Sequence, residues 1–184
     1  DFSEEALKEA ESIPQSVQPN EKIDRLDLTN ETIFTIDSIH TKDMDDAISI
    51  KKLANGNYIL GVHIADVAHY IKPGTQLFKE ALKRGTSVYL GEVVIPMIPS
   101  ILSNGICSLN AGVDRLALSC IMEIDENGNV IGHRLAETVI RVTRRMSYTE
   151  VNKILTVMRS EEGTPETEAE KIETEREYGE LVEQ

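Results

Sequence analysis

Runs of apolar, β-branched residues alternate along this chain with short polar segments rich in turn residues. Residues 32–37 alternate between polar and apolar side chains as a half-buried strand does. Residues 47–53 and 58–64 are apolar runs joined by Ala-Asn-Gly-Asn, and residues 116–124 and 130–142 flank Asp-Glu-Asn-Gly-Asn. Asn-Gly between two such runs is typical of a hairpin turn, so the pattern predicts two β-hairpins.

Helical patterns are short and lie between or beside these strands. Residues 3–12 predict a short acidic helix that ends before Pro14. Residues 76–84 predict a second helix, which ends at Gly85 and places four apolar side chains on one face: Leu77, Phe78, Ala81 and Leu82. Residues 87–98 then return to extended structure. Ser147-Tyr-Thr-Glu150 is a capping box and predicts a third helix that continues through Val157.

Together these elements predict an α+β fold, with a mostly antiparallel mixed sheet and flanking helices. Residues 1–30 are interpreted as a connector, because after the first helix they are polar and lack periodicity. Residues 31–158 form the compact domain, and residues 159–184 are predicted to be an acidic segment, either helical or disordered.

The charge of the chain limits the classes of partner. Its 184 residues carry a formal net charge of −13, and residues 160–184 alone contain ten glutamates and two basic residues. Such a balance disfavours a module that holds nucleic acid by bulk electrostatics alone.

No apolar run is long enough to span a bilayer, and the first residues have no signal-peptide pattern, so we expect no membrane partner and a cytoplasmic protein. Two cysteines, Cys107 and Cys120, form no CxxC pair and are expected to be free thiols.

The segment TIDSIHTKDMDDAISI, residues 35–50, crowds four aspartates between two apolar flanks: Asp37, Asp43, Asp45 and Asp46. Two unit charges about 4 Å apart repel by about 1 kcal/mol in water and by several-fold more where they are partly buried. Carboxylate oxygens are hard ligands that suit Mg²⁺ or Mn²⁺, and two such ions would balance the four charges. The spacing fits neither one strand face nor one helix face, so the carboxylates must converge from a strand end and the loop that follows it.

An EF-hand calcium loop and a solvated acidic loop are the alternatives to a magnesium site in this segment. An EF-hand loop starting at Asp43 would have Ala47 at its fifth position and Ile48 where its glycine belongs, so the pattern excludes it. A solvated acidic loop stays open as an alternative. Acidic surface loops seldom run directly into an apolar strand such as residues 47–50, and this favours metal binding.

These aspartates and several later motifs resemble the ribonuclease II and ribonuclease R family of RNB-type 3′-5′ exoribonucleases. After the segment from Thr35 to Ala47, the same order is kept by residues 61–71 (GVHIADVAHYI) and 85–89 (GTSVY). It continues through residues 95–99 (IPMIP), 102–110 (LSNGICSLN) and 141–148 (RVTRRMSY). The similarity covers about residues 24–155, and its general character is closer to ribonuclease R than to ribonuclease II.

The resemblance implies an enzyme that hydrolyses single-stranded RNA processively from its 3′ end to 5′-nucleoside monophosphates, using Mg²⁺, with Mn²⁺ as an alternative ion. It implies that Asp37 and Asp46 ligate metal directly, that Asp43 completes the ligand shell, and that Asp45 is tied most closely to the chemical step. Two-metal catalysis by such carboxylates is established chemistry for phosphodiester hydrolysis.

The resemblance also implies RNA contacts. Tyr89 matches an aromatic clamp on the 3′-terminal bases, Tyr148 matches a tyrosine near the ribose, and Arg145 matches a phosphate contact. Stacking and ribose recognition are what an enzyme needs to hold any RNA sequence and reject DNA. The alternative for each tyrosine is core packing with a hydrogen-bonded hydroxyl. His63, Asp66 and His69 are interpreted as supports of the sheet and its turn, and His40 receives no role.

The similarity reaches only about the first half of the family's catalytic domain. The remainder of that domain, together with cold-shock-like domains before it and an S1 domain after it, is expected outside residues 1–184. We therefore expect this chain to be part of a larger, monomeric enzyme and to have weak activity or none by itself. The alternative is a non-catalytic, metal-stabilised module that binds RNA or protein on the same fold.

Overall fold

The computed structural model describes residues 1–90, 93–159, 171–174 and 178. Its main sheet has seven strands in the order β1-β8-β7-β4-β3-β2-β9. The four inner pairs of neighbouring strands are antiparallel. The two edge pairs, β1 with β8 and β2 with β9, are parallel. The strands of this sheet are β1 (Leu26–Leu28), β2 (Phe34–Asp37), β3 (Asp46–Lys52), β4 (Tyr58–Ala65), β7 (Asp114–Ile124), β8 (Val130–Arg141) and β9 (Arg144–Ser147).

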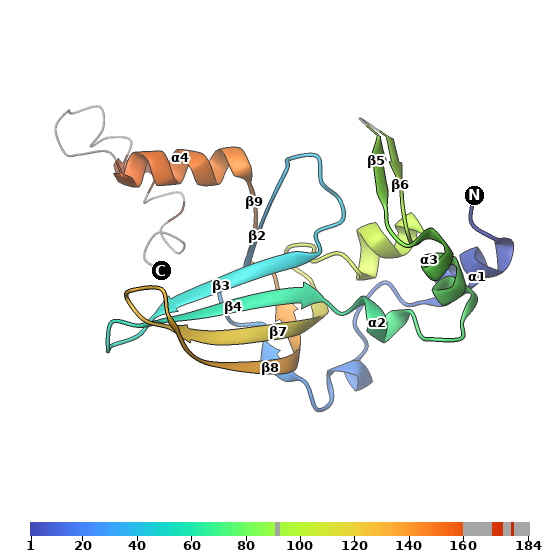
Figure 1. Ribbon diagram of the computed structural model, residues 1–184, viewed down its shortest axis with the longest axis horizontal. Coiled ribbons are helices and arrows are strands. Elements are labelled where there is room, and N and C mark those ends of the chain that lie inside the picture. The colour runs from blue at the N-terminus through green and yellow to red at the C-terminus, as the bar shows by residue number, and fades with distance from the viewer. Residues whose placement is uncertain (91–92, 160–170, 175–177, 179–184) are drawn as a thin grey trace.

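The other elements lie at the two ends of the sheet (Figure 1). At one end a second, two-stranded ladder rises beside three helices, and at the other end α4 follows β9. These elements are α1 (Glu4–Ser12), η1 (Pro19–Lys22), α2 (Val67–Tyr70), α3 (Gln76–Arg84), β5 (Val88–Leu90), β6 (Val93–Ile95), η2 (Leu102–Ile106) and α4 (Tyr148–Arg159). The α+β architecture with a mostly antiparallel sheet is as predicted.

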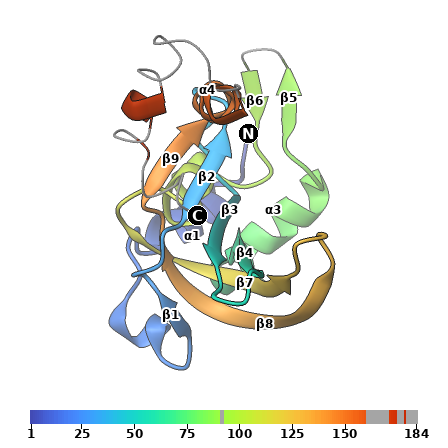
Figure 2. The ribbon, with the colours of Figure 1, turned by 90° about the vertical axis from the view of Figure 1, so that its left-hand side faces the viewer.

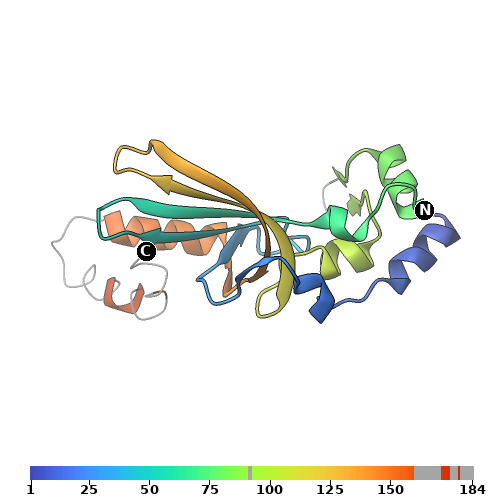
Figure 3. The ribbon, with the colours of Figure 1, turned by 90° about the horizontal axis from the view of Figure 1, so that it is seen from below.

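Both predicted hairpins form. Strand β3 pairs antiparallel with β4 around Gly56, and β7 pairs with β8 around Gly128. Each of these glycines has a positive φ, 89° and 83°, a backbone region that other residues adopt only at a steric cost. The long β7–β8 hairpin curves away from the rest of the sheet (Figure 3).

Helix α3 confirms most of its prediction and corrects one residue. Gly85 ends it with φ 75°, and Thr75 accepts a hydrogen bond from the Phe78 amide at its start. Leu77 is 1% exposed, whereas Leu82 is 73% exposed and points away from the core. The apolar face is therefore narrower than the sequence suggested, because only one side of the helix meets neighbouring elements.

The packed structure begins before residue 31. Strand β1 pairs with the far end of β8, and in α1 Ala6 and Ala10 are fully buried. The Glu9 carboxylate accepts hydrogen bonds from the Gln76 and Leu77 amides at the start of α3. Residues of α1 and β1 within residues 1–30 are thus packed against the remainder of the chain. The three-part division of the chain itself stays a prediction.

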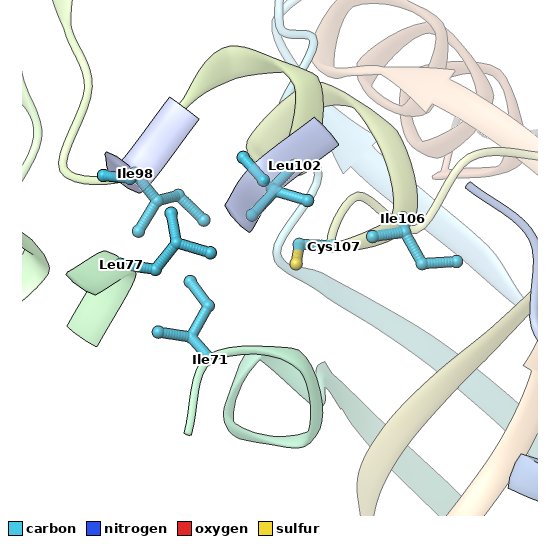
Figure 4. Close-up of a cluster of buried hydrophobic side chains, with 8 residues drawn as sticks. Ile71, Leu77, Ile98, Leu102, Ile106 and Cys107 are labelled. Carbon is cyan, nitrogen blue, oxygen red and sulfur yellow. The ribbon is translucent and has the colours of Figure 1, made fainter. Parts of the chain in front are cut away.

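Among the described residues, three apolar clusters form the core. The first cluster holds together the helices at one end of the sheet. Figure 4 shows its side chains, which come from α3, η2 and the segments beside them: Ile71, Leu77, Ile98, Leu102, Ile106 and Cys107. A second lies under the β2–β3 loop and includes Ile33, Met44, Leu109 and Ile140. The third joins β2 and β9 to the C-terminal segment through Phe34, Met146 and Tyr178.

The predicted acidic segment, residues 159–184, lies mostly outside the described residues. Within it, residues 171–174 are helical and Tyr178 is buried.

Both cysteines are free thiols, as expected, and burial raises the pKa of Cys107 to about 12. Across the described part of the chain, no helix is both long and apolar enough to cross a membrane.

A chain of polar side chains crosses four strands inside the sheet. Fully buried His63 on β4 lies 3.1 Å from the Ser49 hydroxyl on β3 and 2.7 Å from the Ser119 hydroxyl on β7. Ser119 in turn lies 2.7 Å from the Thr138 hydroxyl on β8. Burial lowers the pKa of His63 to about 4, so the ring is neutral at pH 7 and joins the strands by hydrogen bonds alone.

Gly61 leaves room for this chain of hydrogen bonds. A Cβ atom at Gly61 would overlap the Ser49 hydroxyl and lie 2.7 Å from Nε2 of His63. We expect Gly61→Ala to lower the free energy of unfolding by about 1–3 kcal/mol, the usual cost of overpacking a filled interior. Urea unfolding followed by circular dichroism measures it.

A matched control for Gly61→Ala is Gly132→Ala on β8, where an added Cβ meets no atom within 4 Å. The urea concentration at the midpoint of unfolding of Gly132→Ala should stay close to that of the wild type. Equal midpoints for the two variants would show that the His63 ring and the Ser49 hydroxyl move aside freely, contrary to the prediction.

Candidate metal and RNA site

The ends of two antiparallel strands bring the aspartates together. Asp37 is the last residue of β2 and Asp46 is the first of β3. The two strands pair through Phe34 and Ile48, so Asp37 and Asp46 lie at the same end of the sheet. The loop between them, residues 38–45, carries the other two aspartates and rises above the sheet in Figure 1. The predicted convergence from a strand end and a loop is therefore what the backbone provides.

Met44 anchors this loop in the core. Its side chain is 2% exposed, within the cluster that includes Leu109 and Ile140. Its amide donates to the Ser108 hydroxyl at 3.0 Å, and its carbonyl accepts from the Leu109 amide at 2.8 Å. The next carbonyl, that of Asp45, accepts from the Ala65 amide at the end of β4. Because Met44 is held inward, the neighbouring Asp43 and Asp45 are left at the more solvent-accessible side of the loop.

The four carboxylates act on one another electrostatically. Partial burial raises the pKa of Asp45, and the negative charges of the other three aspartates raise it further. Burial also raises the pKa of Asp37, with contributions from Asp46 and Asp43 and an opposing one from the Arg145 guanidinium. Solvent reaches Asp45, but the protein around it still removes part of the hydration of its charge. The site thus holds an excess of negative charge that a cation would relieve.

The donor set suits a divalent metal. Oδ2 of Asp37 is buried and has no hydrogen-bond partner among the described residues. A buried carboxylate oxygen without a donor is costly unless a cation or water meets it. Within the described residues, no three acidic, histidine or cysteine side chains are already gathered at metal-ligand separations. The four aspartates therefore share a region and a charge, and their side chains would have to turn toward an ion in order to bind it.

Tyr89 lies beside this group of aspartates. It belongs to β5, which with β6 forms a short ladder whose described residues are all exposed. The Tyr89 ring is 62% exposed, and its hydroxyl donates to Oδ2 of Asp43 at 2.9 Å. This hydrogen bond and partial burial raise the pKa of Tyr89, so the hydroxyl stays protonated at neutral pH. The ladder and the β2–β3 loop rise on the same side of the sheet in Figure 1.

Tyr148 and Arg145 lie on the other side of the loop. Tyr148 is the first residue of α4, which Figure 2 shows almost end-on, and it is 63% exposed. It lines a shallow cavity of about 530 Å³ together with loop and helix residues: Ser38, Ile39, Ser147, Thr149, Glu150 and Lys153. Since both tyrosines are exposed, core packing does not account for either. Arg145 donates to carbonyl oxygens of the loop, and its predicted RNA contact, like those of the tyrosines, stays a prediction.

The polar residues interpreted as structural are confirmed in that role. His63 joins strands within the sheet. Asp66 accepts from the His69 amide at the start of α2, and its Oδ2 lies 2.7 Å from Nη2 of Arg25. His69 contacts Glu21 at 2.8 Å. His40 is exposed within the loop. The capping box at Ser147 and Glu150 is also confirmed, since each side chain accepts from the other residue's amide.

Two features that position the site were not found from the sequence. Ser108 and Leu109 hold the middle of the loop through Met44, although their motif carried no assigned role. Arg25 forms a buried ion pair with Asp66. Asp66 directly follows Ala65, whose amide donates a hydrogen bond to the Asp45 carbonyl. The motif CSLN at residues 107–110 was the only sequence signal for the support by Ser108 and Leu109. Arg25 is a single arginine in a polar segment, which gave no signal for its ion pair with Asp66.

Comparisons with known proteins show which family this chain resembles. Residues 25–182 match the RNB domain. Ribonuclease R of Thermotoga maritima is 54% identical and ribonuclease R 1 of Lactococcus lactis is 50% identical, each over 155 residues and 84% of this chain. RNase R of Mycoplasma genitalium, solved in complex with double-stranded RNA, superposes with a TM-score of 0.80 and 33% identity, covering 95% of this chain and 31% of that chain.

The chain spans about a fifth of the two curated relatives, 22% of the Thermotoga protein and 19% of the Lactococcus protein. The shared region contains both strands that bear aspartates, the loop between them and the β5–β6 ladder. The family match extends over most of the 184 residues, and it agrees with the fold of the solved relative. This chain belongs to the RNB domain family.

Proposed function

We propose that this chain is the first part of the catalytic domain of a 3′-5′ exoribonuclease that hydrolyses single-stranded RNA to 5′-nucleoside monophosphates. The observation that carries the proposal is the meeting of four aspartates at one end of the sheet, where burial and mutual repulsion raise the pKa of Asp37 and of Asp45. Such an arrangement costs stability and is typical of a functional site. Solved RNase R chains from Mycoplasma genitalium include complexes with RNA, which supports RNA as the substrate class.

Asp37, Asp43, Asp45 and Asp46 would hold Mg²⁺, with Mn²⁺ as an alternative ion. When bound, these ions supply activation of water and neutralisation of charge on the phosphate and the leaving 3′ oxygen. The unpartnered Oδ2 of Asp37 is available to a ligand without breaking a hydrogen bond within the described residues. Asp43 would exchange its contact with Tyr89 for one with metal, or keep both through its two oxygens.

The protein's own side chains would position the RNA. The exposed Tyr89 ring offers a stacking surface for a base near the aspartates, and stacking of this kind tolerates any sequence. Tyr148, which lines the cavity across the loop, would contact the ribose, whose 2′-OH distinguishes RNA from DNA. The RNA end would thus lie between the β5–β6 ladder and the start of α4, above the loop. Neither base stacking on Tyr89 nor a ribose contact by Tyr148 requires a positively charged surface, which agrees with the acidic composition of the chain.

The test is a time course with 5′-labelled single-stranded RNA and Mg²⁺, using the complete polypeptide to which this chain belongs. We expect a ladder of products that shorten stepwise from the 3′ end, no cleavage of the matching DNA, and full loss of activity with EDTA that excess Mg²⁺ restores. The 184-residue chain alone should shorten RNA weakly or not at all. A complete polypeptide that binds RNA but never shortens it, with either Mg²⁺ or Mn²⁺, would instead identify a non-catalytic module.

A further inference from the structure

Arg145 lies on edge strand β9, parallel to the strand that delivers the first aspartate. The register pairs Thr35 with Arg145 and Asp37 with Ser147. Arg145 is therefore close to the point where the chain leaves β2 and enters the loop. Strand β9 follows directly from β8 and leads into α4, so its backbone is held at both ends by regular structure.

The Arg145 guanidinium contacts three main-chain oxygens of this loop. Its Nη2 atom lies 3.2 Å from the Ser38 carbonyl, 2.8 Å from that of Ile39 and 2.6 Å from that of Thr41. The same turn is closed by the Thr41 amide, which donates to the Ser38 carbonyl at 3.0 Å. A charged donor makes stronger hydrogen bonds than a neutral one. One side chain thus gathers the carbonyls of the first half of the loop around a single nitrogen.

This half of the loop has little other support from side chains. Ile39 is 72% exposed, and Ser38 and His40 are also exposed. The second half differs, since Met44 is buried and bonded to Ser108 and Leu109. The span from Asp37 to Asp43 is therefore anchored at its far end by the core and at its near end by Arg145. Loss of the arginine would free the near end while the far end stays in place.

We propose that Arg145 is a positioning residue, which holds the loop so that Asp37 and Asp43 face the same metal-binding region. This inference rests on the proposed function and adds to it a role that differs from the predicted phosphate contact. The charge of Arg145 serves the same end, since it opposes the rise in the pKa of Asp37 that burial and the neighbouring aspartates cause. Because the Nη2 hydrogens are committed to the loop, phosphate could meet only the remaining N–H groups.

The test compares Arg145→Met, Arg145→Lys and Arg141→Met in the complete polypeptide. Arg141 is the matched control, because it is the last residue of β8, the strand before β9 in the sequence, and it pairs with Asp114 instead of the loop. Single-turnover decay of RNA is measured across RNA and Mg²⁺ concentrations. For Arg145→Met we expect a rate at saturating RNA that is lower by roughly 10- to 100-fold, a several-fold higher half-saturating Mg²⁺ concentration, and an RNA Kd within about twofold of wild type.

Arg145→Lys should recover part of the rate, because an ammonium group keeps the charge and can reach fewer of the three carbonyls at once. The control Arg141→Met should behave as the wild type does. A weaker RNA Kd for Arg145→Met with an unchanged rate at saturating RNA would overturn the proposal and identify a phosphate contact.

Amide hydrogen exchange of the same variants separates this inference from the proposed function. In Arg145→Met, exchange should rise within residues 38–42 and stay unchanged within residues 46–52 of β3. If the wild-type protein fails to shorten RNA but exchange changes in this way, the exoribonuclease assignment fails and the role of Arg145 in holding the loop stands. Unchanged exchange at residues 38–42 would refute that role whatever the enzyme activity.

Discussion

Replacing Asp45 with asparagine is expected to slow RNA hydrolysis at saturating RNA by roughly 10²- to 10⁴-fold, the range typical of groups that act in the chemical step. The substitution keeps the size of the side chain and removes its charge. Asp45 is the member of the group whose pKa is raised by all three of the other aspartates, so its carboxylate has the strongest reason to share a cation with them. Its backbone is held by the Ala65 amide and should keep its position in the variant.

RNA affinity should be unchanged or slightly higher in Asp45→Asn, because one negative charge near the phosphates is gone. The measurement is a single-turnover time course together with an equilibrium RNA-binding titration on the complete polypeptide. Asp24→Asn is a suitable control: Asp24 is exposed and has φ 65°, which asparagine also tolerates. Equal rates for Asp45→Asn and wild type would remove the aspartates from catalysis and leave them as a structural feature.

Asp66→Asn is expected to destabilise the fold by about 3–5 kcal/mol, the usual cost of breaking a buried ion pair on one side. Arg25 and Asp66 are 6% and 8% exposed, and their side chains meet at 2.7 Å. Asparagine keeps the oxygen that caps α2 through the His69 amide, but it can place an amide donor against the guanidinium. Arg25 also approaches Glu137 at 3.9 Å, so the lower end of the range is the more realistic expectation.

Urea unfolding with a shared m-value measures this change, and Glu4→Gln is the control. Glu4 forms an ion pair with Lys8 at 3.9 Å in which both side chains are largely exposed, so its midpoint should not move. If Asp66→Asn were as stable as Glu4→Gln, other contacts would make up for the loss of the Arg25–Asp66 ion pair, and this pair would not anchor the N-terminal segment. Asp66 directly follows Ala65, so a large loss of stability would also loosen the support of Asp45.

Local chemistry predicted the elements that depend on neighbours in the sequence. Asn-Gly turns at Gly56 and Gly128 defined both long hairpins, Gly85 ended α3, and the Ser147–Glu150 capping box started α4. Each of these features is decided within a few residues, through a positive φ or a hydrogen bond between side chain and backbone. The exposed position of Leu82 shows the limit, since helical periodicity indicates a face but cannot say how much of it another element covers.

Edge strands β1 and β9 were not predicted, because their partners lie far away in the sequence. Leu28 pairs with Ile140, and Asp37 pairs with Ser147. Three or four residues have too little pattern to be identified as a strand, and parallel pairing across about a hundred residues becomes favourable only after the sheet has formed. For the same reason the packing of α1 on α3 through Glu9 could not be foreseen, and residues 1–30 looked like a connector.

The sequence by itself determined the identity of the candidate ligands, since four aspartates within ten residues must repel one another unless a cation is near. It also determined two hairpins, the first of which, β3–β4, carries Asp46 and the polar residues of β4. Only the tertiary structure decided how these aspartates are presented: burial of Met44 turns its neighbours outward, Ser108 and Leu109 hold the middle of the loop, and Arg145 holds its start. The physical reason is that each of these supports comes from a segment more than sixty residues away, and such contacts arise only when the sheet and the core bring distant parts of the chain together.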